Sequence, residues 1–173
     1  CNIEVASEYR YRRPVLLDNT LFVTLSQSGE TADTIEALKT AKKLNKNIFT
    51  LCITNSEESS LTRLSELTFL THAGPEIGVA STKAFTTQLL ALALLNCALG
   101  HVKKTINNAQ EKSIVHGLKR LPNLINDALL QENQIKKIAV RFKNINSALF
   151  LGRGTMHAIS LEGALKLKEI TYI

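Results

Sequence analysis

The sequence has 173 residues, of which 45% are hydrophobic and 21% charged, and it carries a formal net charge of +6 at pH 7. Both fractions are close to globular averages, so disorder, collagen-like repeats and a coiled coil are disfavoured. The length suits one domain, or one domain with part of another. The longest apolar-rich stretch, residues 89–99, is interrupted by Asn96 and is shorter than the ~20 residues that a membrane span needs. We therefore predict no membrane helix.

The positive charges are dispersed along the sequence. Basic and aromatic residues interleave only at residues 9–13, Tyr-Arg-Tyr-Arg-Arg. Nucleic-acid binding is disfavoured, because base-stacking surfaces need more aromatic residues than the 5% found here. A general attraction for anionic substrates fits better. Cys1, Cys52 and Cys97 are odd in number and widely spaced, which predicts a reducing cytosol and no disulfide or zinc framework.

The first third of the sequence predicts a β-α-β unit. Residues 2–6 alternate weakly and suggest a short strand. Residues 21–25 form a β-favouring run, and the polar loop at residues 26–30 follows it. Apolar residues at helical spacing predict a helix over residues 31–43, and a second apolar strand follows at residues 47–53.

The remaining segments continue this alternation. Helical patterns occur at residues 61–65, 81–99, 106–130, 133–142 and 157–170. Strand patterns occur at residues 67–71 and 147–151. We expect the helix at residues 81–99 to be buried, and we allow a break near Pro122. Apolar strands alternating with helices predict an α/β fold, in which a parallel sheet is covered on both faces.

The first strand-to-helix turn could hold an anion, because ligands of open α/β sheets collect at the carboxyl ends of strands. The run Ser26-Gln27-Ser28-Gly29-Glu30-Thr31 has three hydroxyls beside a glycine. Hydroxyls and backbone amides can surround a terminal phosphate monoester. The run lacks the Gly-Lys-Ser/Thr ending of a nucleotide P-loop and the three-glycine dinucleotide pattern, so ATP, GTP and NAD are not expected. The alternative is that Ser28 or Thr31 only caps the helix.

The second turn brings Ser81 and Thr82 to the N-terminus of the next long helix, where either could be only a cap. Lys83 follows them. A cation in the first helical turn opposes the helix dipole, so we expect Lys83 to have an anionic partner or to point to solvent.

The third turn leads into a helix on which Glu162, Lys166 and Glu169 share one face. One interpretation is a solvated stripe of ion pairs. The other is a carboxylate base beside an ammonium, which suits proton abstraction next to a carbonyl. The four histidines are too dispersed to suggest a metal centre, and no motif calls for a cofactor. We therefore expect neither a metal nor a cofactor.

Four segments together resemble the isomerase region of the glutamine:fructose-6-phosphate aminotransferase family: residues 24–34, 76–88, 149–154 and 161–170. Residues 3–12 are similar to that family as well, and residues 102–143 carry the weakest resemblance. The family is built from sugar isomerase (SIS) domains, which are flavodoxin-like three-layer α-β-α sandwiches. The resemblance implies a first SIS domain at residues 1–143, lacking its opening strand and helix, and the truncated beginning of a second at residues 144–173.

The same resemblance implies roles for single residues. The residues implied to bind the substrate phosphate are Ser26, Gln27, Ser28 and Thr31. Those implied to line the sugar site are Val79 and Ser81. Glu169 would be the base that moves a proton between C2 and C1 during ketose-to-aldose isomerisation, with Lys166 and Glu162 in support.

The resemblance also implies substrates and partners. The implied substrates are fructose 6-phosphate and glutamine, and the implied product is glucosamine 6-phosphate. The resemblance further implies a glutaminase domain in the same parent chain, a homodimer and a cytoplasmic location. Groups for glutamine hydrolysis, ring opening and imine formation are expected outside this chain, so we expect the piece alone to be inactive. Cys1 is not expected to be the glutaminase nucleophile, because the residues after it resemble the isomerase region. The alternative left open is a SIS-type module that senses a phosphosugar without converting it.

Overall fold

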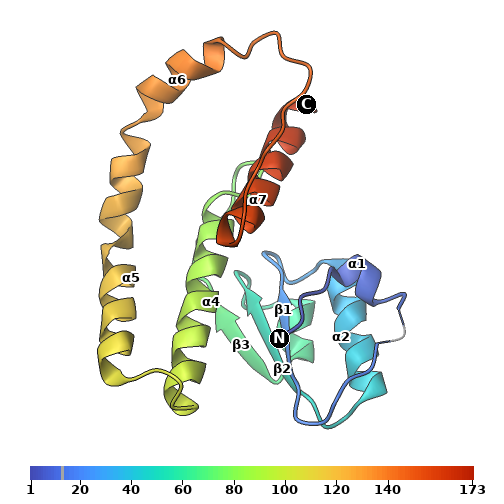
Figure 1. Cartoon of the computed structure of the whole chain (residues 1–173). Helices are drawn as coiled ribbons and strands as arrows, with labels where there is room; N and C mark the ends of the chain where they lie inside the picture. Colours follow the sequence, from blue (N-terminus) through green and yellow to red (C-terminus); the bar gives the residue numbers. More distant parts are fainter. Residues whose placement is uncertain (13) are drawn as a thin grey trace. The chain divides into compact units, whose positions relative to one another are not determined.

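The computed structural model describes residues 1–12 and 14–173 (Figure 1). Arg13, the last residue of the basic run, lies outside the described residues. The chain divides into two compact units. The first contains Cys1–Glu76 and Thr82–Leu94, and the second contains Ile77–Ser81 and Leu95–Ile173.

A parallel three-stranded sheet forms the centre of the first unit (Figure 1). Its strands are β1 (Leu21–Leu25), β2 (Phe49–Thr54) and β3 (Leu67–Leu70), with β2 in the middle. Every residue of β2 except Phe49 is buried, as expected for the central strand of a parallel sheet. The predicted α/β arrangement with a parallel sheet is therefore confirmed.

Three helices lie entirely within the described part of this unit: α1 (Ala6–Tyr9), α2 (Ala32–Leu44) and α3 (Ser60–Leu64). Helix α2 contacts α1, α3 and β1. Its Leu38 is fully buried in one cluster with Cys52 of β2 and Leu61 of α3. Full burial of one such leucine contributes about 1.5 to 3 kcal/mol. This part of the core therefore joins α2, α3 and the central strand β2.

A second cluster joins the start of the chain to the same helix. Tyr9 is buried together with Ala37, Ala41 and Ile48, and its ring lies 5.5 Å from that of Phe22. The expected strand at residues 2–6 is wrong, because Ala6 begins α1 instead. The Tyr9 N–H donates to the Val5 carbonyl and the Arg10 N–H to the Ala6 carbonyl, which forms a single helical turn. This turn places Tyr9 in the core.

The remaining helices are α4 (Lys83–Val102), α5 (Asn108–Leu129), α6 (Glu132–Val140) and α7 (Thr155–Thr171). Pro122 lies inside α5, and the helix continues past it to Leu129. Asn107 and Gln110 form a capping box at the start of α5. The helical expectations for this half of the chain are thus confirmed, including the separation of α5 from α6, and the break allowed near Pro122 does not occur.

The expected strand at residues 147–151 is not formed. This segment has no regular secondary structure, and no strand in the described ranges is paired with it. A strand is stabilised by hydrogen bonds to a neighbouring strand, so a β-favouring sequence alone does not produce one. Leu149 and Leu151 are both 82% exposed.

Helix α4 is less buried than the sequence predicted. Only Ala84, Ala91 and Cys97 are buried, while Leu89 and Leu99 are 43% and 40% exposed. The helix has 20 residues and is apolar enough, by length and composition alone, to cross a membrane. The prediction of no membrane helix considered only residues 89–99, whereas α4 extends over Lys83–Val102. A core helix of a globular domain has the same length and composition, so this property is weak evidence for a membrane.

Candidate functional site

The loop between β1 and α2 begins at the carboxyl edge of the sheet. The Ser26 N–H donates to the Ile53 carbonyl at 3.1 Å, which extends the pairing of β1 with β2 by one step. The Ser26 Oγ lies 2.8 Å from the Thr31 Oγ1 and accepts a hydrogen bond from the Gly29 N–H at 3.1 Å. The structure thus brings Ser26 and Thr31, the two ends of the predicted phosphate loop, into contact.

The middle of this loop is fixed through its backbone. The Gln27 carbonyl accepts hydrogen bonds from the Asn55 N–H at 3.0 Å and from the Thr54 hydroxyl at 3.2 Å. Ser28 is exposed, and its Oγ accepts from the Glu30 N–H at 3.1 Å. The two remaining predicted phosphate ligands therefore lie on a loop whose path is set by the end of β2.

Gly29 is the residue that allows this path. Its φ of +68° falls in the left-handed region, where residues other than glycine are strained. A Cβ on Gly29 would lie 2.1 Å from the Oγ of the buried Ser59. The loop can approach the segment before α3 this closely only because residue 29 has no side chain.

Neither Ser28 nor Thr31 caps α2. Thr31 occupies the N-cap position, but its side chain makes no capping hydrogen bond within the described residues. Its hydroxyl is paired with Ser26, and the Ser28 hydroxyl is paired with the Glu30 amide. The alternative interpretation of this turn as a simple cap is therefore wrong. The first-turn amides of α2 remain available to an anion, and the helix dipole favours negative charge there.

The first turn of α2 also contains a carboxylate, Asp33, which would oppose an anion. Its Oδ1 lies 2.6 Å from the Arg10 Nη1. The same arginine lies over the Tyr11 ring, 4.9 Å from its centroid. Arg12 pairs with Glu4 and with Glu8. The described arginines of the basic run are therefore engaged by carboxylates of the chain itself.

The two predicted sugar-site residues lie in the connection between Glu76 and α4. Val79 is 97% exposed, and Ser81 is half-buried. Both belong to the second compact unit, whereas the loop of residues 26–31 belongs to the first. Helix α4 begins at Lys83, two residues later than the sequence predicted.

Glu76, which the sequence reasoning did not single out, binds the first turn of α4. One carboxylate oxygen accepts from the Thr82 hydroxyl at 3.0 Å and the other from the Ala84 N–H at 3.0 Å. The hydrogen bond from Ala84 is the main cause that lowers the pKa of Glu76, and the charge of Lys83 adds to it. Lys83 therefore has a carboxylate neighbour, which was one of its two predicted surroundings.

The three predicted catalytic side chains meet on α7. The Lys166 Nζ lies 2.6 Å from the Glu169 Oε2 and 3.5 Å from the Glu162 Oε1. Their side chains are 24%, 34% and 24% exposed, respectively, so the group is not fully solvated. The hydrogen bond to Glu169 is the main cause that raises the pKa of Lys166. The two ion pairs fit both interpretations of this helix face, a stripe of ion pairs and a carboxylate beside an ammonium.

The sequence reasoning also missed the second loop at the sheet edge. Asn55 donates to the Gly74 carbonyl at 2.7 Å and accepts from the Thr71 hydroxyl and the Ala73 N–H. It thereby joins the loops that follow β2 and β3. Ser59 caps α3 in a capping box with Thr62. The sequence signature of such a box has Glu or Gln at the position of Thr62, so the sequence gives no clear signal for it.

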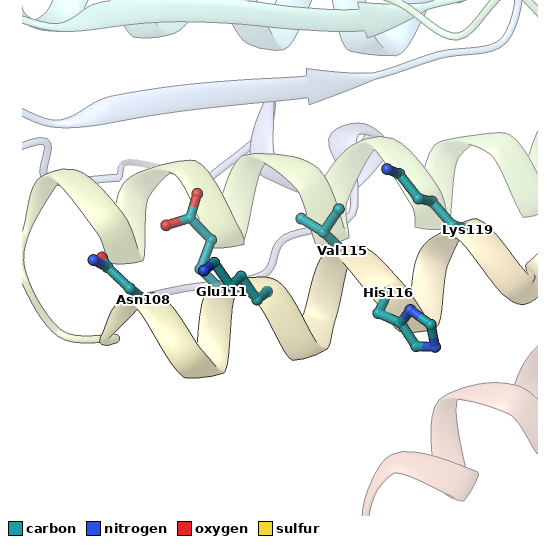
Figure 2. Close-up of a pocket in the computed structure, with 6 residues that line it drawn as sticks. Asn108, Glu111, Val115, His116 and Lys119 are labelled. Carbon is teal, nitrogen blue, oxygen red and sulfur yellow. The ribbon is translucent and has the colours of Figure 1, made fainter.

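A surface depression of about 410 Å³ lies along α5 (Figure 2). It is lined by Asn108, Glu111, Lys112, Val115, His116 and Lys119, all from this one helix. None of them is a predicted site residue. Within residues 1–12 and 14–173, no group of three or more His, Cys, Asp or Glu side chains could hold a metal ion.

Comparison with known proteins assigns the family. The family model described as "SIS domain" matches residues 1–98. The chain belongs to the SIS domain family. The match includes the loop of residues 26–31, the Glu76 region and most of α4, so these are parts of an SIS domain and α4 is one of its helices.

The chain is also similar over its whole length to glutamine-fructose-6-phosphate aminotransferases. It is 54% identical over 173 residues to glutamine-fructose-6-phosphate aminotransferase (isomerizing) of Pseudomonas syringae pv. tomato. It is 51% identical over 173 residues to the protein of the same name from Escherichia coli K12. The chain covers 28% of the length of each of these two relatives.

A solved structure gives the same result for the fold. The C-terminal domain of glucosamine-fructose-6-phosphate aminotransferase from Francisella tularensis superimposes with a TM-score of 0.96 at 48% identity. The match covers 100% of this SIS domain chain and 49% of that chain. The resemblance noted from the sequence is therefore confirmed, and the fold is the SIS fold.

Proposed function

We propose that this chain is the phosphosugar-binding and isomerising part of an enzyme that converts fructose 6-phosphate and glutamine into glucosamine 6-phosphate and glutamate. The chain covers 28% of its aminotransferase relatives, so this activity belongs to a longer protein. Within it, we propose residues 1–143 as a first SIS domain and residues 144–173 as the beginning of a second. The proposal includes a glutaminase domain in the same parent chain, a homodimer and a cytoplasmic location.

The observation that carries the proposal is the loop of residues 26–31. Its hydroxyls face one another across the loop, at 2.8 Å between Ser26 and Thr31, and no side chain in the described residues caps the helix that follows. A phosphate monoester needs several neutral donors around three oxygens, and free helix amides with nearby hydroxyls supply them. Ser26, Gln27, Ser28 and Thr31 are the proposed phosphate ligands, and Val79 and Ser81 the proposed sugar contacts.

The proposed chemistry is carried by α7. Isomerisation of a ketose-derived substrate requires removal of a proton from C1 and its return to C2, with charge developing on the heteroatom that is double-bonded to C2. A carboxylate can move the proton, and a cation beside it can stabilise the charge. Glu169 lies 2.6 Å from Lys166, so we assign the proton transfer to Glu169 and charge stabilisation to Lys166, with Glu162 orienting the ammonium.

The test of binding is calorimetric titration of the full-length protein with glucose 6-phosphate, with free glucose as the control ligand. We expect binding that requires the phosphate and weakens in Ser28→Ala. Equal affinity for glucose and glucose 6-phosphate would contradict the proposed phosphate site.

The test of chemistry is Glu169→Gln, which removes the base and keeps the size of the side chain. We expect sugar phosphate binding to persist and product formation to fall by about two to four orders of magnitude, the usual contribution of a general base. Undiminished turnover would remove Glu169 from the mechanism. A protein that binds the sugar phosphate tightly without turnover, even with Glu169 present, would instead be the non-catalytic sensing module.

A further inference from the structure

The carboxylate of Glu30 joins two loops at the carboxyl edge of the sheet. One of its oxygens accepts from the Ser60 N–H and the other from the Ser60 hydroxyl, each at 2.7 Å. Hydrogen bonds to an ionised carboxylate are shorter and stronger than those between neutral groups. Glu30 thus ties the loop of residues 26–31 to the beginning of α3, which lies thirty residues further along the chain.

No other side chain of this loop makes such a link within the described residues. The hydroxyls of Ser26, Ser28 and Thr31 bond to groups inside the loop. The other links to the rest of the unit are made by the backbone, including the Gly29 carbonyl, which accepts from the Leu61 N–H at 3.1 Å. The position of the loop relative to α3 is therefore held by this backbone hydrogen bond and by one side chain of the loop, Glu30.

The negative charge of Glu30 bears on phosphate binding by the same loop. A carboxylate on a loop that binds phosphate would repel the ligand unless it were held elsewhere. Here Ser60 holds both oxygens, and the hydrogen bond from its hydroxyl is the main cause that lowers the pKa of Glu30, with a smaller contribution from the charge of Arg63. The carboxylate therefore stays ionised and stays bound to the α3 side.

We propose that Glu30 is a positioning residue, which acts through Ser60 to hold the loop of residues 26–31 in the conformation that binds a sugar phosphate. This inference rests on the proposed function, because it assigns Glu30 to the phosphate site of that proposal. Glu30 does not touch the phosphate. It sets the affinity for the phosphate group and leaves the proton transfer at Glu169 unchanged.

The experiment compares variants of the full-length protein. Glu30→Ala removes both hydrogen bonds, and Ser60→Ala removes only the one from the hydroxyl. Ser60→Thr keeps both donors and serves as the conservative rescue. Glu57→Gln is the matched control, because Glu57 is an exposed carboxylate in the adjacent turn that forms no hydrogen bond or ion pair in the described part of the chain.

Two readouts are needed. Without ligand, amide hydrogen exchange at Gly29 and Leu61 should speed up about tenfold or more in Glu30→Ala, the effect of losing charge-assisted hydrogen bonds, while exchange in β2 stays unchanged. With substrate, KM for fructose 6-phosphate should rise by a similar factor of about ten while kcat changes by less than about threefold. Ser60→Ala should show a smaller effect, and Ser60→Thr and Glu57→Gln should behave as the wild type.

The outcomes separate this inference from the proposed function. If Glu30→Ala changes neither the exchange nor KM while Ser28→Ala abolishes binding, the role of Glu30 is overturned and the phosphate site stands. A fall in kcat at constant KM, or faster exchange without any change in KM, also overturns it. If the wild-type protein does not distinguish glucose 6-phosphate from glucose, both proposals fall together.

Discussion

Gly29→Ala is the substitution whose cost follows most directly from the structure. The residue has a φ of +68°, and holding alanine in this region costs about 1 to 2 kcal/mol. The new Cβ would also lie 2.1 Å from the Ser59 Oγ and 2.5 Å from the Ser59 Cβ. Ser59 is fully buried and caps α3, so it cannot turn away freely. Overpacking of this kind costs about 1 to 3 kcal/mol.

The expected loss is therefore about 2 to 5 kcal/mol for the region around β1, β2 and α3, a large part of the 5 to 15 kcal/mol typical of a domain. The assay is native-state hydrogen exchange of the amides in β2, which reports opening free energies region by region. Their protection should fall by about 30-fold or more, since each 1.4 kcal/mol corresponds to a factor of ten. Phosphosugar binding should weaken as well, because the loop cannot keep its close approach to Ser59.

The two causes can be separated with Ser59→Gly, which removes the atoms that clash. At an N-cap position this change should cost only a few tenths of a kcal/mol. In that background Gly29→Ala should retain only its backbone cost of about 1 to 2 kcal/mol, giving a coupling between the two sites of about 1 to 3 kcal/mol. Additive costs would refute the assigned clash. Gly117→Ala is a control that should raise stability instead of lowering it. Nothing lies within 4 Å of the added Cβ, and alanine in place of glycine should stabilise α5 by about 1 kcal/mol.

Four further outcomes are expected. Lys166→Met should lower kcat while leaving phosphosugar affinity within about threefold, as measured by steady-state kinetics, because it removes charge stabilisation and not a phosphate contact. Glu76→Gln should speed amide exchange at Ala84 without changing exchange in β2, since it weakens the acceptor that binds this amide. Pro122→Ala should slow exchange in α5, because it restores a helical N–H donor. The pKa of Glu30 is lowered from 4.5, so the stabilisation from its carboxylate is present above about pH 4.5 and is lost as the pH falls through the lowered pKa. Amide exchange at Gly29, measured between about pH 5 and 3, should detect this loss.

The sequence was most informative where structure depends on neighbouring residues. The run at residues 21–25 has the same bounds as β1, and the helical spacing after Thr31 predicted α2 to within a residue. Both patterns depend on residues close in sequence, the first on a run of β-favouring side chains and the second on apolar residues at helical spacing. The hydroxyl-rich loop was found for the same reason. Its composition is visible in the sequence, although the pairing of Ser26 with Thr31 is not.

The sequence was least informative where structure depends on distant partners. The run at residues 147–151 has strand composition, but a strand also requires a neighbouring strand, which the described ranges do not provide. Burial of α4 depends in the same way on what covers it. The bonds of Glu30 to Ser60 link loops thirty residues apart, and no spacing rule connects the two.

The run Ser-Gln-Ser-Gly-Glu-Thr contains no lysine or arginine, although the chain as a whole has a net charge of +6. A phosphate bound there would meet neutral donors and helix amides, and it would release few counterions from the loop. Affinity would therefore change little with ionic strength, in contrast to a lysine-lined site, whose affinity falls as salt screens its charges. A site of this kind selects its ligand by the shape and number of its oxygens, so the many other polyanions of a cell would compete poorly for it.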